Sequence, residues 1–237
     1  IAINIIRIIF QEHRSQILEG TLGLSSHEDI CRDVGLRIRT LTSLSLRPVV
    51  NGTGVILHTN LGRAPLANHD LQNLTRIAES YSNLELDLPA GTRSSRQTHV
   101  IPAITALTYA ENALVLNNNA AAMLLAVTAT SKNREVIVSR GEQIEIGGGF
   151  RIPDILRESG AKIVEVGSTN RTRIEDYRQA ITLQTGALLK VHPSNFKMIG
   201  FTESPDLKDL VALGREFELP VLVDLGSGCL IDTSQYG

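Results

Sequence analysis

The sequence predicts an α/β fold in which helices cover both faces of a mostly parallel sheet, preceded by a short helical segment. Short continuous apolar runs recur through the second half of the chain, as expected for strands buried on both faces. Segments of helical length separate these runs, and this alternation is typical of a parallel sheet. The chain has 237 residues, of which 42% are hydrophobic and 20% charged, enough for one large domain with a small appendage.

Residues 1–47 are predicted to form a helical N-terminal segment, and residues 48–237 the large domain. One helix is expected over Ile3–Leu18. A second helix is expected to open at Ser26, because Asp29 three positions later completes a capping-box pattern.

The second helix carries apolar residues at helical spacing, which give it one apolar face: Ile30, Val34, Ile38 and Leu41. The apolar run at 1–10 is too short to span a bilayer and Arg7 interrupts it, so we expect a buried helix there. The chain starts without methionine and stops at Gly237, just after a strand-like segment, so we expect it to be cut at both ends.

The large domain begins with irregular chain. Residues 47–66 are rich in glycine and proline, which indicates extended chain and turns. A helix is expected around Asp70–Ser80, followed by a loop of small and charged residues at 88–99. The predicted strands after it are 113–116, 136–139, 163–166, 187–191 and 221–225. The predicted helices between them are 118–130, 153–159, 173–181 and 206–217.

Ligands bind at the carboxyl ends of the strands in open α/β sheets. The first predicted strand leads to Asn118 and Asn119, and three alanines follow at the start of a helix. Free N–H groups there, aided by the helix dipole, can hold a phosphate, although a plain asparagine N-cap is the alternative. The stretch fits neither GxGxxG nor GxxxxGK[ST], which disfavours dinucleotides and nucleoside triphosphates.

The last predicted strand closes with Asp224, a position where a carboxylate needs a partner. A protonated pyridine nitrogen is such a partner, as in enzymes that use pyridoxal 5′-phosphate (PLP). Gly226, Ser227 and Gly228 then leave room for a flat ring, and Ser227 is a candidate cofactor-binding residue. An aspartate at a strand end is also common in nucleotide-binding folds.

The second predicted strand leads into SRGEQIEIGGGFRIP. Gly147–Gly149 permit unusual backbone angles or a close approach of a ligand. Arg140, Glu142 and Glu145 place charges beside these glycines. A solvated loop is the alternative interpretation.

The fourth predicted strand is followed by His192, Ser194 and Asn195, and a lone histidine at such an edge is more often structural than catalytic. No histidine shows an HxxxH or HExxH spacing and no GxSxG motif occurs, which disfavours metal-dependent and serine hydrolases. Cys31 and Cys229 form no CxxC pair, so we expect no metal site and a reducing, cytoplasmic setting. The net charge of −2 gives no overall attraction for nucleic acid.

Six stretches from about Arg47 to Gly237 together resemble the selenocysteine synthase family, whose members are L-seryl-tRNA(Sec) selenium transferases. HTNLGR and SRGE…EIGGGFRIP are the most specific of the matching motifs, whereas the aspartate strand is generic to PLP enzymes. The matching stretches are NGTGVILHTNLGRAPL, LVLNNNAAAMLLAV, VIVSRGEQIEIGGGFRIPDIL, VEVGSTNRT, LLKVHPSNFKMIGFT and VLVDLGSG.

The resemblance implies the large domain of an aspartate-aminotransferase-like (fold type I) PLP enzyme, cytoplasmic and assembled as a ring of dimers. It implies that serine esterified to tRNA(Sec) loses its hydroxyl to give an aminoacrylyl intermediate, to which selenium from selenophosphate adds. By position in that fold, Asn118 and Asn119 hold the cofactor phosphate and Asp224 faces the ring nitrogen. His192, a candidate catalytic residue, and Asn195 lie near the ring.

Arg63 in HTNLGR is the candidate for binding the selenium donor, because a guanidinium fork suits phosphate-like oxygens. Arg93 and Arg96 are further candidates for contacts to phosphate or tRNA. The lysine that holds PLP in such enzymes is expected beyond Gly237, and none of the five lysines in the chain occupies its place. This segment alone is therefore expected to be inactive.

Two other functions remain open at this point. One is a related PLP lyase that acts on a small amino acid or sugar acid without tRNA. The other is a non-catalytic RNA-binding or scaffold subunit that has lost PLP. An assay with seryl-tRNA(Sec) separates the first from selenium transfer, and the codons after Gly237 decide the second.

Overall fold

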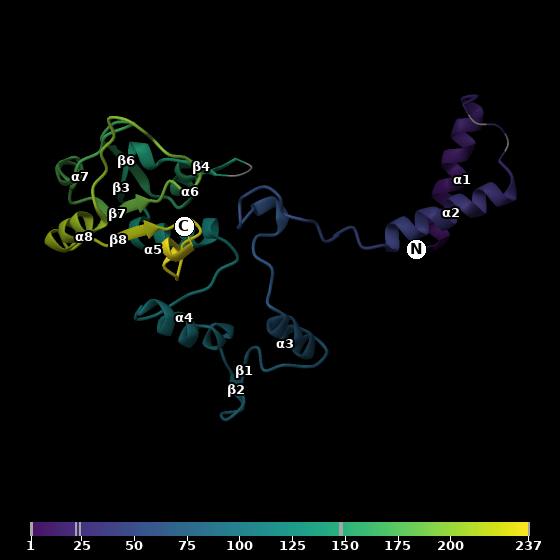
Figure 1. Cartoon of the computed structure of the whole chain (residues 1–237), viewed down its shortest axis with the longest axis horizontal. Helices are drawn as coiled ribbons and strands as arrows, with labels where there is room; N and C mark the ends of the chain where they lie inside the picture. The colour runs from purple at the N-terminus through teal and green to yellow at the C-terminus, as the bar shows by residue number, and fades with distance from the viewer. Residues whose placement is uncertain (1, 22, 24, 147–148, 237) are drawn as a thin grey trace. The chain divides into compact units, whose positions relative to one another are not determined.

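The computed structural model describes residues 2–21, 23, 25–146 and 149–236, and it divides into two compact units, Ile1–Leu66 and Ala67–Gly237. Figure 1 shows the elements of both units in chain order by colour. The helices of the described residues include none that is long and apolar enough to cross a membrane.

The first unit is built on a helical hairpin of α1 (Ala2–Leu18) and α2 (His27–Thr42). The predicted capping box is confirmed: the Ser26 hydroxyl accepts a hydrogen bond from the Asp29 N–H, and the Asp29 carboxylate accepts one from the Ser26 N–H. These bonds satisfy two N–H groups that a helix start leaves without intrahelical partners.

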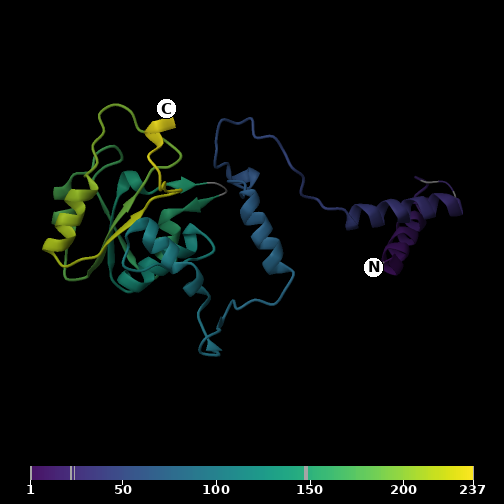
Figure 2. The same cartoon turned by 60° about the horizontal axis from the view of Figure 1, so that its bottom comes forward.

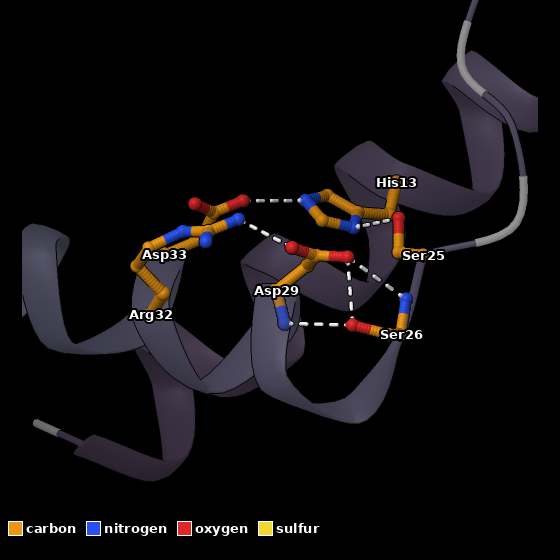
Figure 3. Close-up of polar contacts among 6 residues, drawn as sticks. All are labelled: His13, Ser25, Ser26, Asp29, Arg32 and Asp33. Atoms are coloured by element: carbon orange, nitrogen blue, oxygen red, sulfur yellow. Dashed lines mark hydrogen bonds and ion pairs between the residues drawn. The ribbon is translucent and has the colours of Figure 1, made fainter.

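A histidine joins the two helices and their connection (Figure 3). His13 on α1 places Nε2 3.1 Å from the Asp33 carboxylate on α2. Its Nδ1 lies 2.9 Å from the Ser25 hydroxyl in the connecting loop. Only 15% of the His13 side chain is exposed, so the ring fixes the loop between the helices.

The expectation of a buried N-terminal helix is wrong for most of its side chains. In α1, Ile5 and Ile9 are buried, whereas Ile3 is 66% and Phe10 53% exposed. A two-helix hairpin buries only the side chains that face the partner helix, so a helix that is apolar all round keeps exposed residues. After α2 the chain is mostly irregular, as predicted, with one 3₁₀ turn at Thr59–Leu61.

The second unit opens with α3 (Asn68–Ala78), which confirms the helix predicted near residue 70. The predicted loop at 88–99 is only partly a loop, because β1 (Leu86–Asp87) pairs antiparallel with β2 (Thr92–Arg93) and a 3₁₀ helix spans Arg96–His99. Helix α4 (Ile101–Thr108) was not predicted, although Pro102 in its first turn is a typical helix-start signal.

The core of the second unit is a parallel four-stranded sheet with the strand order β6-β3-β7-β8. This confirms four of the five predicted strands and the predicted fold class. The strands are β3 (Glu135–Ser139), β6 (Lys162–Val166), β7 (Thr185–Val191) and β8 (Val221–Asp224). The helices between them are α5 (Asn119–Ser131), α6 (Ile152–Glu158), α7 (Ile174–Ala180) and α8 (Leu207–Glu216). Outside the sheet, β4 (Glu145–Ile146) pairs antiparallel with β5 (Phe150–Arg151).

Helices cover both faces of this sheet, as the views in Figures 1 and 2 show together. Alternate strand residues pack on opposite sides because side chains of a strand point alternately to its two faces. Val138 and Leu189 pack with residues of α5 and α6 in one core cluster. Ile137 and Leu188 pack with residues of α7 and α8 in the other.

The predicted strand at 113–116 is not a strand in the structure. Val115 donates its N–H to the Gln97 side-chain oxygen (3.0 Å), and its carbonyl accepts from the Gln97 side-chain nitrogen (2.9 Å). The amide of one side chain thus takes the hydrogen bonds that a neighbouring strand would form. An apolar run alone does not reveal which groups will pair with its backbone.

Candidate functional site

The carboxyl ends of β7 and β8 bring several of the predicted site residues together. Val191 of β7 lies opposite Asp224 of β8 in the register, and the His192 N–H donates to the Asp224 carbonyl at 2.9 Å. Asp224 is only 4% exposed. A buried carboxylate is costly unless hydrogen bonds or a cation compensate it.

The two oxygens of the Asp224 carboxylate differ in their surroundings. Oδ1 accepts hydrogen bonds from the Asn119 side-chain amide (3.0 Å) and from the Gly226 N–H (2.9 Å). No described residue donates a hydrogen bond to Oδ2. The hydrogen bonds to Oδ1 therefore fix the carboxylate in place, and Oδ2 is left to accept a hydrogen bond from a ligand.

The start of α5 lies beside this carboxylate because Asn119, its first residue, contacts Asp224. Asn118 caps the helix, since its side-chain oxygen accepts the Ala121 N–H at 2.9 Å. The earliest N–H groups of a helix have no intrahelical partner, and together with the helix dipole they attract anions. Asn118 is thus an N-cap in the structure, and Asn119 faces the aspartate.

The segment after β7 approaches the turn after β8. Gly226 has a φ of +63°, and a Cβ atom at this position would lie 3.1 Å from Cβ of Ser194 and 4.0 Å from Cδ2 of His192. Only glycine accommodates both the backbone angle and the close approach. Asn195 in turn donates its side-chain amide to the Glu145 carbonyl at 2.9 Å.

Ser227 lies on an exposed turn in which the Gly228 N–H donates to the Leu225 carbonyl at 3.2 Å. Ser227 is the third residue after Asp224 in the chain. Its side chain forms no hydrogen bond with a described residue.

The segment SRGEQIEIGGG separates into buried and exposed parts. Gly147 and Gly148 lie outside the described residues. Arg140 pairs with Glu165 and Glu145 with Arg151 at exposed positions, as expected for a solvated loop. Glu142, in contrast, is 7% exposed and faces Lys190 at 3.0 Å, so the solvated-loop alternative is wrong for this residue.

The side chain of Tyr177, on α7, bridges the carboxyl ends of β3 and β7. Its hydroxyl accepts the Ser139 N–H at 3.0 Å and donates to the Leu189 carbonyl at 3.2 Å. Burial, together with the nearby negative charge of Glu142, raises the pKa of the Tyr177 phenol well above its usual range. The Ser139 hydroxyl also lies 2.7 Å from that of Thr172. Sequence reasoning did not find Tyr177, and it named Glu142 only as one of three charges beside the glycines, without its burial or its partners.

A cavity of about 680 Å³ opens at the same edge of the sheet, and His192 is in its lining. Val223 and Leu225 line it, whereas Asp224 between them points to the face covered by α5. Lys190 and Glu142 also line it. The carboxyl edge thus presents an aspartate and a helix start on one face and a cavity on the other.

Arg93 and Arg96, which were predicted to contact phosphate or tRNA, lie together elsewhere in the second unit. Arg93 is 2.9 Å from the Glu85 carboxylate, and Arg96 binds the other oxygen of the same group. The hydrogen bond and charge of Arg96, and then the charge of Arg93, lower the pKa of Glu85. One carboxylate therefore offsets part of the charge that these arginines would offer a polyanion.

Arg63 belongs to the first unit and is exposed after the 3₁₀ turn at Thr59–Leu61. Its N–H donates to the His58 carbonyl at 3.1 Å, and its φ is +64°. A non-glycine residue in this region is strained, and such strain gathers at functional sites. No ion pair holds its guanidinium among the described residues.

The arrangement can hold a ligand that is anionic at one end and cationic at the other, through the α5 start and the free oxygen of Asp224. Among the described residues there is no group of three or more His, Cys, Asp or Glu side chains that could hold a metal ion.

Comparison with known proteins places the chain among relatives of one kind. The family model described as "SelA: L-seryl-tRNA selenium transferase" matches residues 49–237. A relative named L-seryl-tRNA(Sec) selenium transferase, from Geobacter sulfurreducens, is 57% identical over 86% of this chain and 44% of its own length. A relative of the same name from Geotalea daltonii is 50% identical over 99% of this chain and 51% of its own length. The chain thus spans about half the length of the curated relatives it matches.

Among solved structures, that of D-glucosaminate-6-phosphate ammonia-lyase superposes with a TM-score of 0.59 at 22% identity. The superposition covers 72% of this chain and 47% of the other. At this level of identity the likeness concerns the fold alone.

Proposed function

The chain belongs to the SelA family of L-seryl-tRNA selenium transferases, and from this premise we propose that it forms the cofactor-binding half of a PLP enzyme. The enzyme converts seryl-tRNA(Sec) to selenocysteinyl-tRNA(Sec), with selenophosphate as the selenium donor. It works in the cytoplasm as a homo-oligomer, in keeping with the sequence resemblance.

The observation that carries the cofactor assignment is the half-satisfied carboxylate of Asp224. It is buried, it is fixed through Oδ1 by Asn119 and Gly226, and no described residue donates to its Oδ2. A protonated ring nitrogen fits this carboxylate, because it is both a hydrogen-bond donor and a cation. The phosphate of PLP fits the start of α5, directly beside Asn119. The residues present therefore suit PLP.

Bound PLP supplies an electron sink that permits removal of the serine α-proton and loss of its hydroxyl. The protein residues have separate tasks. Asp224 keeps the proton on the ring nitrogen, and Asn119 orients Asp224. Asn118 fixes the helix start that binds the phosphate. His192 and Asn195 lie on the segment after β7, which would border the ring, and Ser227 lies on the turn after β8 that this segment approaches.

Asp224→Asn in the full-length protein tests this assignment. Asparagine keeps an oxygen for Asn119 and Gly226, so the fold of this edge and part of the PLP affinity should persist. The negative charge that retains the ring proton is lost, and exchange of the serine α-proton with solvent should fall by orders of magnitude. Near-normal exchange in this variant would mean that Asp224 only accepts the hydrogen bonds from Asn119 and Gly226 and has no role at the ring nitrogen.

Arg63 is assigned to the anionic selenium donor, because a guanidinium can bind two oxygens of a phosphate-like group at once. Its exposed side chain and left-handed backbone support this assignment. Arg93 and Arg96 remain weaker candidates for phosphate or tRNA contacts, since both guanidinium groups form ion pairs with the Glu85 carboxylate.

Arg63→Gly is the sharpest test, because glycine removes the side chain while it accepts the φ of +64° without strain. Selenium transfer should be lost while the absorbance of bound PLP persists. Arg63→Ala serves as the matched control, since it lacks the same side chain but keeps the backbone strain. If both variants lose the PLP absorbance, Arg63 holds the cofactor or the structure and not the donor.

A further inference from the structure

Strands β3 and β7 separate at their carboxyl ends, and side chains fill the gap. Their paired register ends at Val138 and Leu189. Just beyond this pair, the Tyr177 hydroxyl accepts a hydrogen bond from the Ser139 N–H and donates one to the Leu189 carbonyl. The next free backbone group on this side of β7 is the N–H of Val191.

Glu142 accepts that N–H. Its Oε2 lies 2.9 Å from the Val191 nitrogen, and its Oε1 lies 3.0 Å from Nζ of Lys190. The Ser204 hydroxyl is 3.1 Å from the same Nζ and 3.4 Å from Oε1. Both carboxylate oxygens thus have partners, as a buried charge requires.

The preceding glycine permits this position. A Cβ atom on Gly141 would lie 2.6 Å from the carbonyl oxygen of Thr169. A larger residue would therefore push the turn away from the neighbouring loop and move Glu142 away from β7. Glycine at this point lets the carboxylate reach the end of β7.

Val191 is the last residue of β7, and the segment His192–Asn195 begins directly after it. The other side of this segment is tied to β8, because the His192 N–H donates to the Asp224 carbonyl. Its far end is tied to β4 through Asn195 and Glu145. The Glu142 bond is the attachment on the β3 side.

We propose that Glu142 is a positioning residue: its carboxylate acts as the missing strand partner of Val191 and thereby fixes His192–Asn195 against the cofactor edge. This inference rests on the proposed function for its effect on the reaction. Its effect on the backbone of Val191 is independent of that function. The competing explanation is that Glu142 only neutralises Lys190.

A matched pair of double variants of the full-length protein separates these roles. Glu142→Gln with Lys190→Met keeps an acceptor for the Val191 N–H, whereas Glu142→Leu with Lys190→Met does not. Neither variant leaves an unpaired buried charge. The single variant Lys190→Met keeps the acceptor and removes only the cation.

Two quantities are measured: amide hydrogen exchange of the peptide that contains Val191 and His192, and kcat and KM for selenium transfer. In the leucine variant, exchange at Val191 should rise about tenfold or more, since its N–H loses its partner. Its kcat should fall by a similar factor, with KM for the tRNA little changed. The glutamine variant should stay within about threefold of Lys190→Met in both quantities.

Equal exchange and equal kcat in the glutamine and leucine variants would overturn the proposal, as would a fall in kcat without faster exchange. If the leucine variant does not fold, the glutamine variant decides, because fast exchange at Val191 in a folded protein that keeps this acceptor contradicts the proposal. A protein without any transferase activity would contradict the proposed function, while the exchange measurement would still test the role of Glu142.

Discussion

Tyr177→Phe removes the α7 hydroxyl that bonds to both β3 and β7, and it should destabilise the protein by about 2–3 kcal/mol. The Tyr177 side chain is fully buried, and phenylalanine fills nearly the same volume, so almost no cavity forms. What is lost is the hydroxyl that pairs the Ser139 N–H and the Leu189 carbonyl, both at buried residues. A buried group left without a partner costs about 1–3 kcal/mol, and carbonyls tolerate this better than N–H groups.

The change is measured by urea unfolding of the wild-type and variant proteins, with amide exchange at Ser139 as a local probe. Exchange at Ser139 should accelerate, because its N–H then has no acceptor. Tyr177→Ala is the control that adds a cavity, and it should cost more, about 3–5 kcal/mol in total. A change below about 0.5 kcal/mol for the phenylalanine variant, within the range of neutral surface substitutions, would refute the bridging role of the hydroxyl.

Further predictions concern the start of α2, the ionisation of Tyr177 and the turn after β8. Ser26→Ala should weaken α2 by about 1 kcal/mol, seen as lower helix content of the hairpin. The hydrogen bond from the Ser26 hydroxyl lowers the pKa of Asp29. The ionised Asp29 therefore stabilises the fold above its unfolded pKa of about 3.9, and this stabilisation is lost as the pH falls further. An acid titration of helix content that is identical in wild type and Ser26→Ala would contradict this. Because the pKa of Tyr177 is raised, its contribution to stability is present below about pH 10 and is lost as the pH rises. The phenol should therefore ionise only together with alkaline unfolding. Reversible ionisation of Tyr177 in the folded protein would contradict this. Gly226→Ala should destabilise the turn after β8 by about 1–2 kcal/mol because of its positive φ and should weaken PLP binding, and an unchanged PLP affinity would show that this turn lies away from the cofactor.

The sequence was sufficient for the parallel sheet because its strands are short apolar runs with helices between them. The four observed strands begin within two residues of the predicted starts. The family expected from motifs such as HTNLGR is confirmed by the match over residues 49–237. Asn119 was expected at the same edge of the sheet as Asp224, and the two residues are in contact, although the segment before Asn119 is not the strand from which this was inferred.

The errors arose where long-range partners decide local structure. The run at 113–116 has the composition of a strand, but the Gln97 side chain forms hydrogen bonds with both the N–H and the carbonyl of Val115. Glu142 stands among other charged residues in the sequence, and nothing local marks it as the one that turns inward. Its burial depends on Val191 and Lys190, which are about fifty residues away in the chain. Sequence periodicity reports which face of an element is apolar, and it carries no information about such pairings.

We propose that this chain provides the cofactor edge of an L-seryl-tRNA(Sec) selenium transferase. The most direct measurement is incubation of the purified full-length protein with PLP, selenophosphate and seryl-tRNA(Sec), followed by analysis of the aminoacyl group. The wild-type protein should form selenocysteinyl-tRNA(Sec), and Asp224→Asn should not. A folded, PLP-loaded protein that leaves seryl-tRNA(Sec) unchanged, or that forms the product equally well with Asp224→Asn, would contradict it.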